Sequence, residues 1–148
     1  MYEYDLTRFL DAQEKTYNQA LQEIKNGYKE THWIWFIFPQ LLGLGESYAA
    51  TYYGIKNLEE AEMYLDNDIL RNRLIEITEA LLNVNGLTIE QIVGYPDNLK
   101  IQSCMTLFNA VDPSFEVFKE VLDKYYDGLE DEATIKMLTP SLNKTTMI

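Results

Sequence analysis

The chain has 148 residues, of which 47% are hydrophobic and 24% are charged, a composition typical of one globular domain and not of a disordered chain. The net charge of −12 disfavours binding to duplex nucleic acid and to anionic membranes, because both affinities come from neutralising negative charge. The single cysteine, Cys104, excludes an internal disulfide and suits a reducing compartment.

The spacing of apolar residues predicts helices joined by short turns along most of the chain. The first is expected to begin at Asp5 and to end at Asn26-Gly27, and a later one to run from Tyr48 to Ile55 after a Ser47 cap. Further helices are predicted from Asn57 to about Leu65, Asp68 to Asn85, Thr88 to Gly94, Pro96 to about Asn109, Ser114 to Gly128 and Asp131 to Leu138.

We therefore expect an all-α, mainly helical fold: a small single-domain orthogonal bundle of about seven or eight helices over residues 1–138. Residues 139–148 show no pattern and are expected to form a flexible C-terminal tail. Residues 33–38 are the one irregular aromatic segment, which fits either a buried strand or a buried helical turn. No apolar run is long enough to span a membrane and no signal peptide is recognisable, so we expect a cytoplasmic protein.

The segment from residue 29 to residue 47 carries the strongest signal for a functional site, because it combines the only His with both Trp residues. His32 could act as a general acid or base, or it could bond a backbone carbonyl and fix the loop. Trp33 and Trp35 could stack on a nucleobase or nicotinamide ring, although such aromatic residues more often belong to the core. Lys29 would supply a cation beside them.

The end of this segment contains the groups that could bind a ligand through hydrogen bonds. Gly43 and Gly45 could present backbone amides to a phosphate, or they could simply form a tight turn. Gln40 and Ser47 could add side-chain hydrogen bonds to a ligand or could cap the turn. The sequence alone leaves each pair of alternatives open.

A second group of polar residues lies in the predicted helix that follows Pro96. Asp97, Lys100 and Ser103 are three residues apart, so they form a polar strip along one helix face. The strip could carry an acid, a cation and a hydroxyl toward a ligand. Alternatively it is a surface ion pair next to hydroxyls that bond the helix backbone. With one His and one Cys, and without a P-loop or dinucleotide fingerprint, no metal or cofactor is expected.

Four stretches of the chain together resemble the family catalogued as domain of unknown function 1810. They are Arg8–Gln13, Tyr17 with Ala20–Gly27, the segment 29–47 with Tyr53, Gly54 and Ile55, and Asp97–Phe108. The string His32-Trp-Ile-Trp-Phe-Ile-Phe-Pro-Gln40 is the most specific part of the resemblance. The resemblance covers roughly Leu6 to Leu138 and implies a small, mainly helical single-domain protein, but it implies no activity or catalytic residue. The order of Ala12-Gln13, residues 59–65, Leu70–Leu74 and Asp97–Lys100 is also similar to that in ADP-ribose-linked N-glycosidases of NAD metabolism.

These observations favour a protein that binds a small nucleotide-derived or NAD/ADP-ribose-type ligand in one pocket. The expected ligand-binding residues are Lys29, Trp33, Trp35, Gln40, Gly43, Gly45, Ser47, Lys100 and Ser103. If the protein is an enzyme, metal-free glycosidic or phosphate-ester cleavage with His32 or Asp97 as acid or base is the simplest reaction. The alternative is a non-enzymatic interaction or regulatory domain with a purely structural aromatic segment. The sequence specifies neither a reaction nor an oligomeric state.

Overall fold

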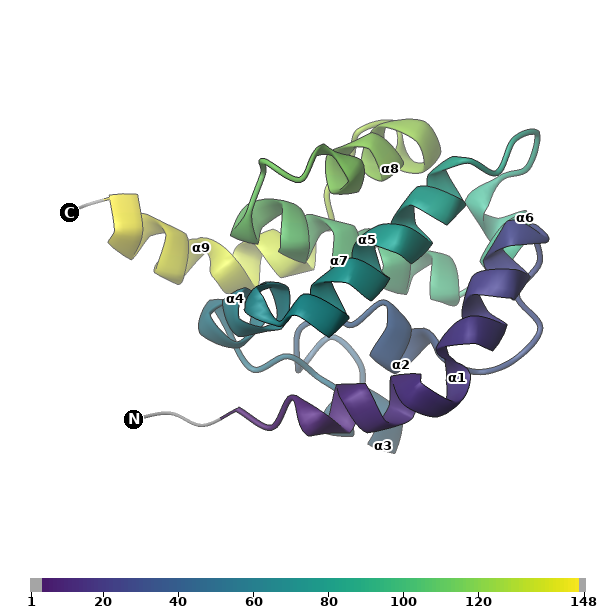
Figure 1. Ribbon diagram of the computed structural model, residues 1–148. Helices are drawn as coiled ribbons and strands as arrows, with labels where there is room; N and C mark the ends of the chain where they lie inside the picture. The colour runs from purple at the N-terminus through teal and green to yellow at the C-terminus, as the bar shows by residue number, and fades with distance from the viewer. Residues whose placement is uncertain (1–3, 147–148) are drawn as a thin grey trace.

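The computed structural model describes residues 4–146, and their side chains as far as residue 140. In this part of the chain there are nine helices and no sheet, which confirms the all-α prediction (Figure 1). The helices are α1 (Thr7–Lys25), α2 (Ile34–Ile37), α3 (Tyr48–Tyr52), α4 (Leu58–Asp66), α5 (Asp68–Leu82), α6 (Ile89–Val93), α7 (Asp97–Val111), α8 (Glu116–Tyr126) and α9 (Glu132–Thr146).

Helix α7 lies at the centre of the fold, where it packs against α2, α4, α6, α8 and α9 (Figure 1). Its central residues are apolar on nearly every side, and Ile101, Cys104, Leu107 and Phe108 are fully buried. A helix that is apolar all round is stable only when other elements enclose it. The sequence of α7 therefore dictates its central place, and the two ends of the helix, at Asp97 and at Val111, reach the surface.

Helices α1, α5 and α8 form the layer that covers one side of this core, with α5 packed between α1 and α8. The inward face of α5 is made by Leu70, Leu74, Ile77 and Leu81, whose spacing of four, three and four is that of one helix face. Each side chain of this size contributes about 1.5–3 kcal/mol when it is fully buried. Burial of these four side chains therefore stabilises the packing of α5 and its layer against the core.

The aromatic segment is a single helical turn, α2, and not a strand. Trp33 and Phe38, which flank the turn, are completely buried, so the segment is part of the core. The chain then extends, and Leu41 forms an isolated parallel bridge with Ile55. Because Ile55 is used in this bridge, α3 ends at Tyr52, earlier than the sequence pattern indicated.

The C-terminal helix α9 is longer than predicted, since it continues past Leu138 to Thr146 and contains Pro140. The predicted tail covered residues 139–148, of which 147 and 148 lie outside the described part of the chain. Its flexibility stays a prediction. Asp131 caps α9 as expected, because its Oδ2 accepts a hydrogen bond from the backbone N–H of Thr134 at 2.9 Å.

A buried ion pair fixes the segment between α3 and α4. Arg8 Nη1 lies 3.0 Å from Glu60 Oε2, and neither side chain is more than 4% exposed. The same guanidinium donates to the carbonyl oxygens of Tyr52 and Gly54, while Glu60 accepts from the backbone N–H of Lys56. These additional hydrogen bonds offset the desolvation cost of burying the two charged side chains. It holds the chain that pairs with residues 40–42.

Candidate functional site

A hollow of about 270 Å³ lies where the turn after α2, the first turns of α7 and the start of α9 meet. Its lining residues are Gln40, Leu44, Gly45, Pro96, Leu99, Lys100, Ser103, Asp131 and Ala133. Four of them, Gln40, Gly45, Lys100 and Ser103, are residues that the sequence singled out for ligand binding. The fold thus brings together the two polar groups that the sequence places far apart.

Gln40 is held in the wall of this hollow by its backbone. Its carbonyl oxygen accepts a hydrogen bond from Ile55 N at 2.9 Å, next to the bridge between Leu41 and Ile55. The residue is only 8% exposed. Across the residues that the structure describes, its side-chain amide has no hydrogen-bond partner. Its amide atoms are not sealed from solvent, so this amide is available to a bound molecule.

Gly45 forms the adjoining part of the wall, and its lack of a side chain is a packing requirement. A Cβ atom built on Gly45 would lie 2.8 Å from the Cβ of Ala50 and 3.7 Å from Gln40 Nε2. The first distance is too short for real carbon atoms. Glycine here lets the turn pack onto α3 and leaves the space beside the Gln40 amide open.

Helix α7 supplies a cation and a hydroxyl to the opposite wall. Lys100 Nζ is 3.8 Å from Asp97 Oδ1, which is too long for a hydrogen bond, so the ammonium group keeps donors for another partner. Ser103 Oγ donates to the backbone carbonyl oxygen of Leu99 at 3.1 Å and still has lone pairs that can accept. The sequence offered this hydrogen bond to the helix backbone as an alternative to ligand binding. In the structure Ser103 forms the bond and also lines the hollow.

Lys29 forms an ion pair with a structural role near this site. Its Nζ lies 2.8 Å from Asp97 Oδ2, with only 6% of its side chain exposed, and 4.9 Å from the centre of the Trp33 ring. Asp97 therefore faces two lysines at the N-terminus of α7, where a negative charge is also favoured by the helix dipole. The pair ties the loop before α2 to α7. Neither Lys29 nor Asp97 lines the hollow.

Glu23 organises the same loop and is a residue that the sequence analysis missed. Its carboxylate is 2% exposed and accepts five hydrogen bonds: from Gln19 Nε2, from the N–H groups of Glu30 and Thr31, from Thr31 Oγ1 and from Trp33 Nε1. Burial alone would raise the pKa of Glu23, but these donors outweigh it and lower that pKa to about 2. The available signal was the position of Glu23 on the apolar stripe of α1, three residues after the buried Ala20.

The two tryptophans belong mainly to the packing of the fold. Trp33 is completely buried, with its Nε1 bonded to Glu23 Oε1 at 2.9 Å, so it has no exposed face on which a ligand could stack. Trp35 is half-buried and lines a crevice beside Gln40 that has no room for a water molecule. Neither ring is part of the hollow.

The remaining predicted residues also lie outside the hollow. His32 is exposed, and its ring has no hydrogen-bond or ionic partner in the described portion of the chain. Lys29, His32 and Lys100 therefore do not converge on one cavity. Gly43 has φ 101°, which explains the glycine in that turn. Ser47 caps α3, since its Oγ accepts from Ala50 N at 3.1 Å.

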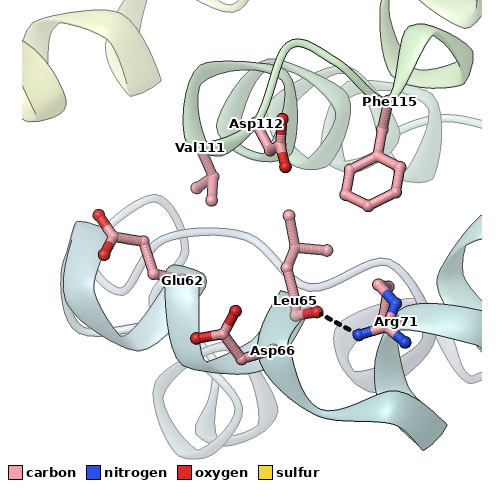
Figure 2. A pocket seen from close by; sticks show the side chains of 7 residues that line it. All are labelled: Glu62, Leu65, Asp66, Arg71, Val111, Asp112 and Phe115. Carbon is pink, nitrogen blue, oxygen red and sulfur yellow. Dashed lines mark hydrogen bonds between the residues drawn. The ribbon is translucent and has the colours of Figure 1, made fainter.

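A second hollow, of about 440 Å³, lies between α4, the start of α5 and the turn after α7 (Figure 2). Figure 2 shows an apolar part, Leu65, Val111 and Phe115, with the acidic side chains of Glu62, Asp66 and Asp112 around it. Arg71 lies at its edge, where its Nη1 donates to the carbonyl oxygen of Leu65 at 3.1 Å. None of the predicted site residues belongs to this second hollow.

Other reactive groups are few in the described structure. Among residues 4–140, no three His, Cys, Asp or Glu side chains are grouped so that they could hold a metal ion. The thiol of Cys104 is fully buried, which raises its pKa and keeps it protonated. None of the described helices combines the length and the apolar character needed to cross a membrane.

Comparisons with known proteins identify a family and name no activity. The family described as protein of unknown function (DUF1810) matches residues 3–138. The crystal structure of the conserved hypothetical protein Rv1873 from Mycobacterium tuberculosis is 46% identical to this chain, with a TM-score of 0.91. The alignment covers 92% of this chain and 97% of that one. A search of curated proteins finds no significant match, and the similarity to ADP-ribose-linked N-glycosidases receives no support. The chain belongs to the DUF1810 family of proteins of unknown function.

Proposed function

We propose that this protein binds a small nucleotide-derived ligand in the hollow between Gln40, Gly45, Lys100 and Ser103. One observation carries the proposal: residues picked for ligand binding from two separate parts of the sequence line one cavity, where the side-chain amide of Gln40 has no hydrogen-bond partner among the described residues. Ligand sites are typically concave, largely apolar and equipped with a few convergent polar groups. The hollow fits this description, with leucine and proline walls between its polar residues.

The size of the hollow limits what it can enclose. Its volume of about 270 Å³ lies just below the range for ligand pockets, which is about 300–1,000 Å³. One ring with its substituents is therefore the natural occupant. The sugar and phosphate groups of a larger nucleotide would extend past the rim, where the Lys100 ammonium group can pair with a phosphate.

The proposal concerns binding and not catalysis. His32 is exposed away from the hollow, and the Asp97 carboxylate is already engaged by Lys29. A general acid or base must lie within hydrogen-bond reach of the reacting atom, and neither residue is part of the lining. The lining supports recognition through hydrogen bonds, one cation and apolar contact.

Thermal-shift measurements with AMP, NAD, ADP-ribose and nicotinamide test the proposal. A ligand at a hundredfold its Kd stabilises the folded protein by about 2.7 kcal/mol, which gives a measurable rise in Tm. Lys100→Met should reduce the shift produced by the phosphate-bearing ligands. Lys119→Met is the matched control, because Lys119 is also paired with an aspartate on the same helix but lies on α8. The absence of a shift with all four compounds, or equal shifts in both variants, would contradict the proposal.

The second candidate function is binding to a basic protein segment, and the second hollow favours it. Its apolar part suits a side-chain stem, and Glu62 and Asp66 are exposed and have no ionic partner in the described structure. Titration with a lysine-rich peptide at low and high ionic strength tests this role. Salt-sensitive binding that is lost in Glu62→Lys, but retained in the control Glu120→Lys on α8, would favour it.

A further inference from the structure

The side-chain amide of Gln40 lines the hollow, where it is available to form hydrogen bonds with a ligand. The residue is more than nine-tenths buried, and its amide lines the cavity without a hydrogen-bond partner among the described residues. An amide presents a donor and an acceptor side by side in one plane. The carbonyl oxygen of Gln40 accepts a hydrogen bond from Ile55 N, which holds the backbone that carries this side chain. Such a group matches a partner that offers an acceptor and a donor in the same arrangement.

The charges around the hollow make a phosphate an unsuitable occupant of its interior. Lys100 contributes one positive charge and Asp131 one negative charge, so the lining has no net charge. Asp131 Oδ2 is used to cap α9, but its Oδ1 has no partner in the part of the chain that the structure describes. This carboxylate would repel an anion placed deep in the hollow. Leu44 and Leu99 provide apolar contact that suits the faces of a flat ring.

We infer that Gln40 selects a flat heterocyclic ring with an amide-like edge, in which one donor lies beside one acceptor. Nucleobases and pyridine carboxamides share this chemistry, and glutamine forms such a paired contact with adenine edges in protein–DNA complexes. This inference rests on the proposed function and specifies which part of the ligand enters the hollow. The ring edge is bound inside by Gln40, and any phosphate stays outside near Lys100.

Two pairs of probes that differ only in the recognised edge test this assignment. Adenine is compared with purine, and nicotinamide with pyridine, by ligand-observed NMR titration of the full chain. The wild-type protein should bind adenine, nicotinamide or both about tenfold more tightly than the matching ring without the amide-like edge. Selection of adenine would identify the nucleobase, and selection of nicotinamide the carboxamide.

Gln40→Leu keeps the approximate volume of the side chain but removes its donor and acceptor. We expect this variant to bind purine and pyridine as the wild type does and to lose the tenfold preference. Because the preference is a ratio measured within one protein sample, a general loss of stability would not imitate this result. Gln22→Leu, on the exposed side of α1, is the control and should keep the preference.

The outcomes separate this inference from the proposed function. If AMP or ADP-ribose binds in a Lys100-dependent way but Gln40→Leu keeps the wild-type preference, the role of Gln40 is refuted and the ligand site stands. If the wild type shows no preference within either pair, the inference also fails. If none of these probes binds, and AMP, NAD and ADP-ribose do not bind either, both the inference and the proposed function fail.

Discussion

Replacing Glu23 by Gln tests how the loop that carries Lys29 is held against α1. The substitution keeps the shape of the side chain, and the Gln oxygen can still accept the three hydrogen bonds that reach Oε1 from Glu30 N, Thr31 N and Trp33 Nε1. It removes the negative charge, and it also replaces Oε2, which accepts from Gln19 Nε2 and Thr31 Oγ1, by an NH2 group that cannot accept. The part of the effect that depends on pH reports the charge.

The magnitude follows from the pKa of Glu23, which is about 2 in the folded protein against an ordinary value of 4.5. Each pH unit between the two values corresponds to about 1.4 kcal/mol, so the ionised carboxylate stabilises the fold by about 3 kcal/mol at neutral pH. Because the folded pKa is the lower one, this stabilisation is complete above pH 4.5. It decreases as the pH falls and is lost below about pH 2.

Urea unfolding followed by tryptophan fluorescence, at several pH values from neutral to about 2, measures this effect. The free energy of unfolding of Glu23→Gln should be lower than that of the wild type by about 1–3 kcal/mol at neutral pH, and the difference should become smaller in acid. Glu30→Gln, an exposed carboxylate in the same loop, should change the stability by less than about 0.5 kcal/mol. A difference for Glu23→Gln that does not depend on pH would refute the reasoning.

Three further predictions concern other features of the fold. Gly45→Ala should lower the free energy of unfolding by about 1–3 kcal/mol, because the new Cβ meets that of Ala50, and Ala50→Gly in the same chain should restore part of the loss in urea unfolding. Cys104 should react with a thiol reagent only as fast as the protein unfolds, since the thiol is fully buried and its pKa is raised; rapid labelling of the native protein would contradict its placement. His32→Ala should change neither Tm nor ligand binding, because the ring is exposed and lies outside the hollow. A loss of binding at unchanged Tm would show that His32 takes part in the site.

The helices could be predicted largely from the sequence because their ends depend on local interactions. The helix predicted to start at Thr88 begins there with a capping box, in which the Thr88 side chain and the Gln91 side chain both bond to backbone N–H groups. The aromatic segment could not be assigned, since a short apolar run fits both a strand and a buried helical turn. The backbone of the folded chain decides between them, because Ile37 N donates to the carbonyl oxygen of Trp33 and Phe38 N to that of Ile34, as in a helical turn.

The candidate site was predictable in part. Gln40 stood out as a polar side chain in the turn that contains Gly43 and Gly45, and Lys100 as part of a polar strip with Asp97 and Ser103 on one helix face. Asp131 was not recognised as part of the lining, because its position there depends on the packing of α9 against α7. The ion pair between Arg8 and Glu60 was missed for the same reason, since its partners are 52 residues apart. Contacts of this kind leave no local pattern.

The central claim, that a nucleotide-derived ligand occupies the hollow, is tested most directly by NMR titration of the isotope-labelled protein with AMP. Backbone amide shifts should move at Gly45, Lys100, Ser103 and Ala133, together with the side-chain amide of Gln40. These residues should respond with one common Kd. Shifts confined to the second hollow, around Glu62 and Phe115, or no shifts at any AMP concentration, would contradict it.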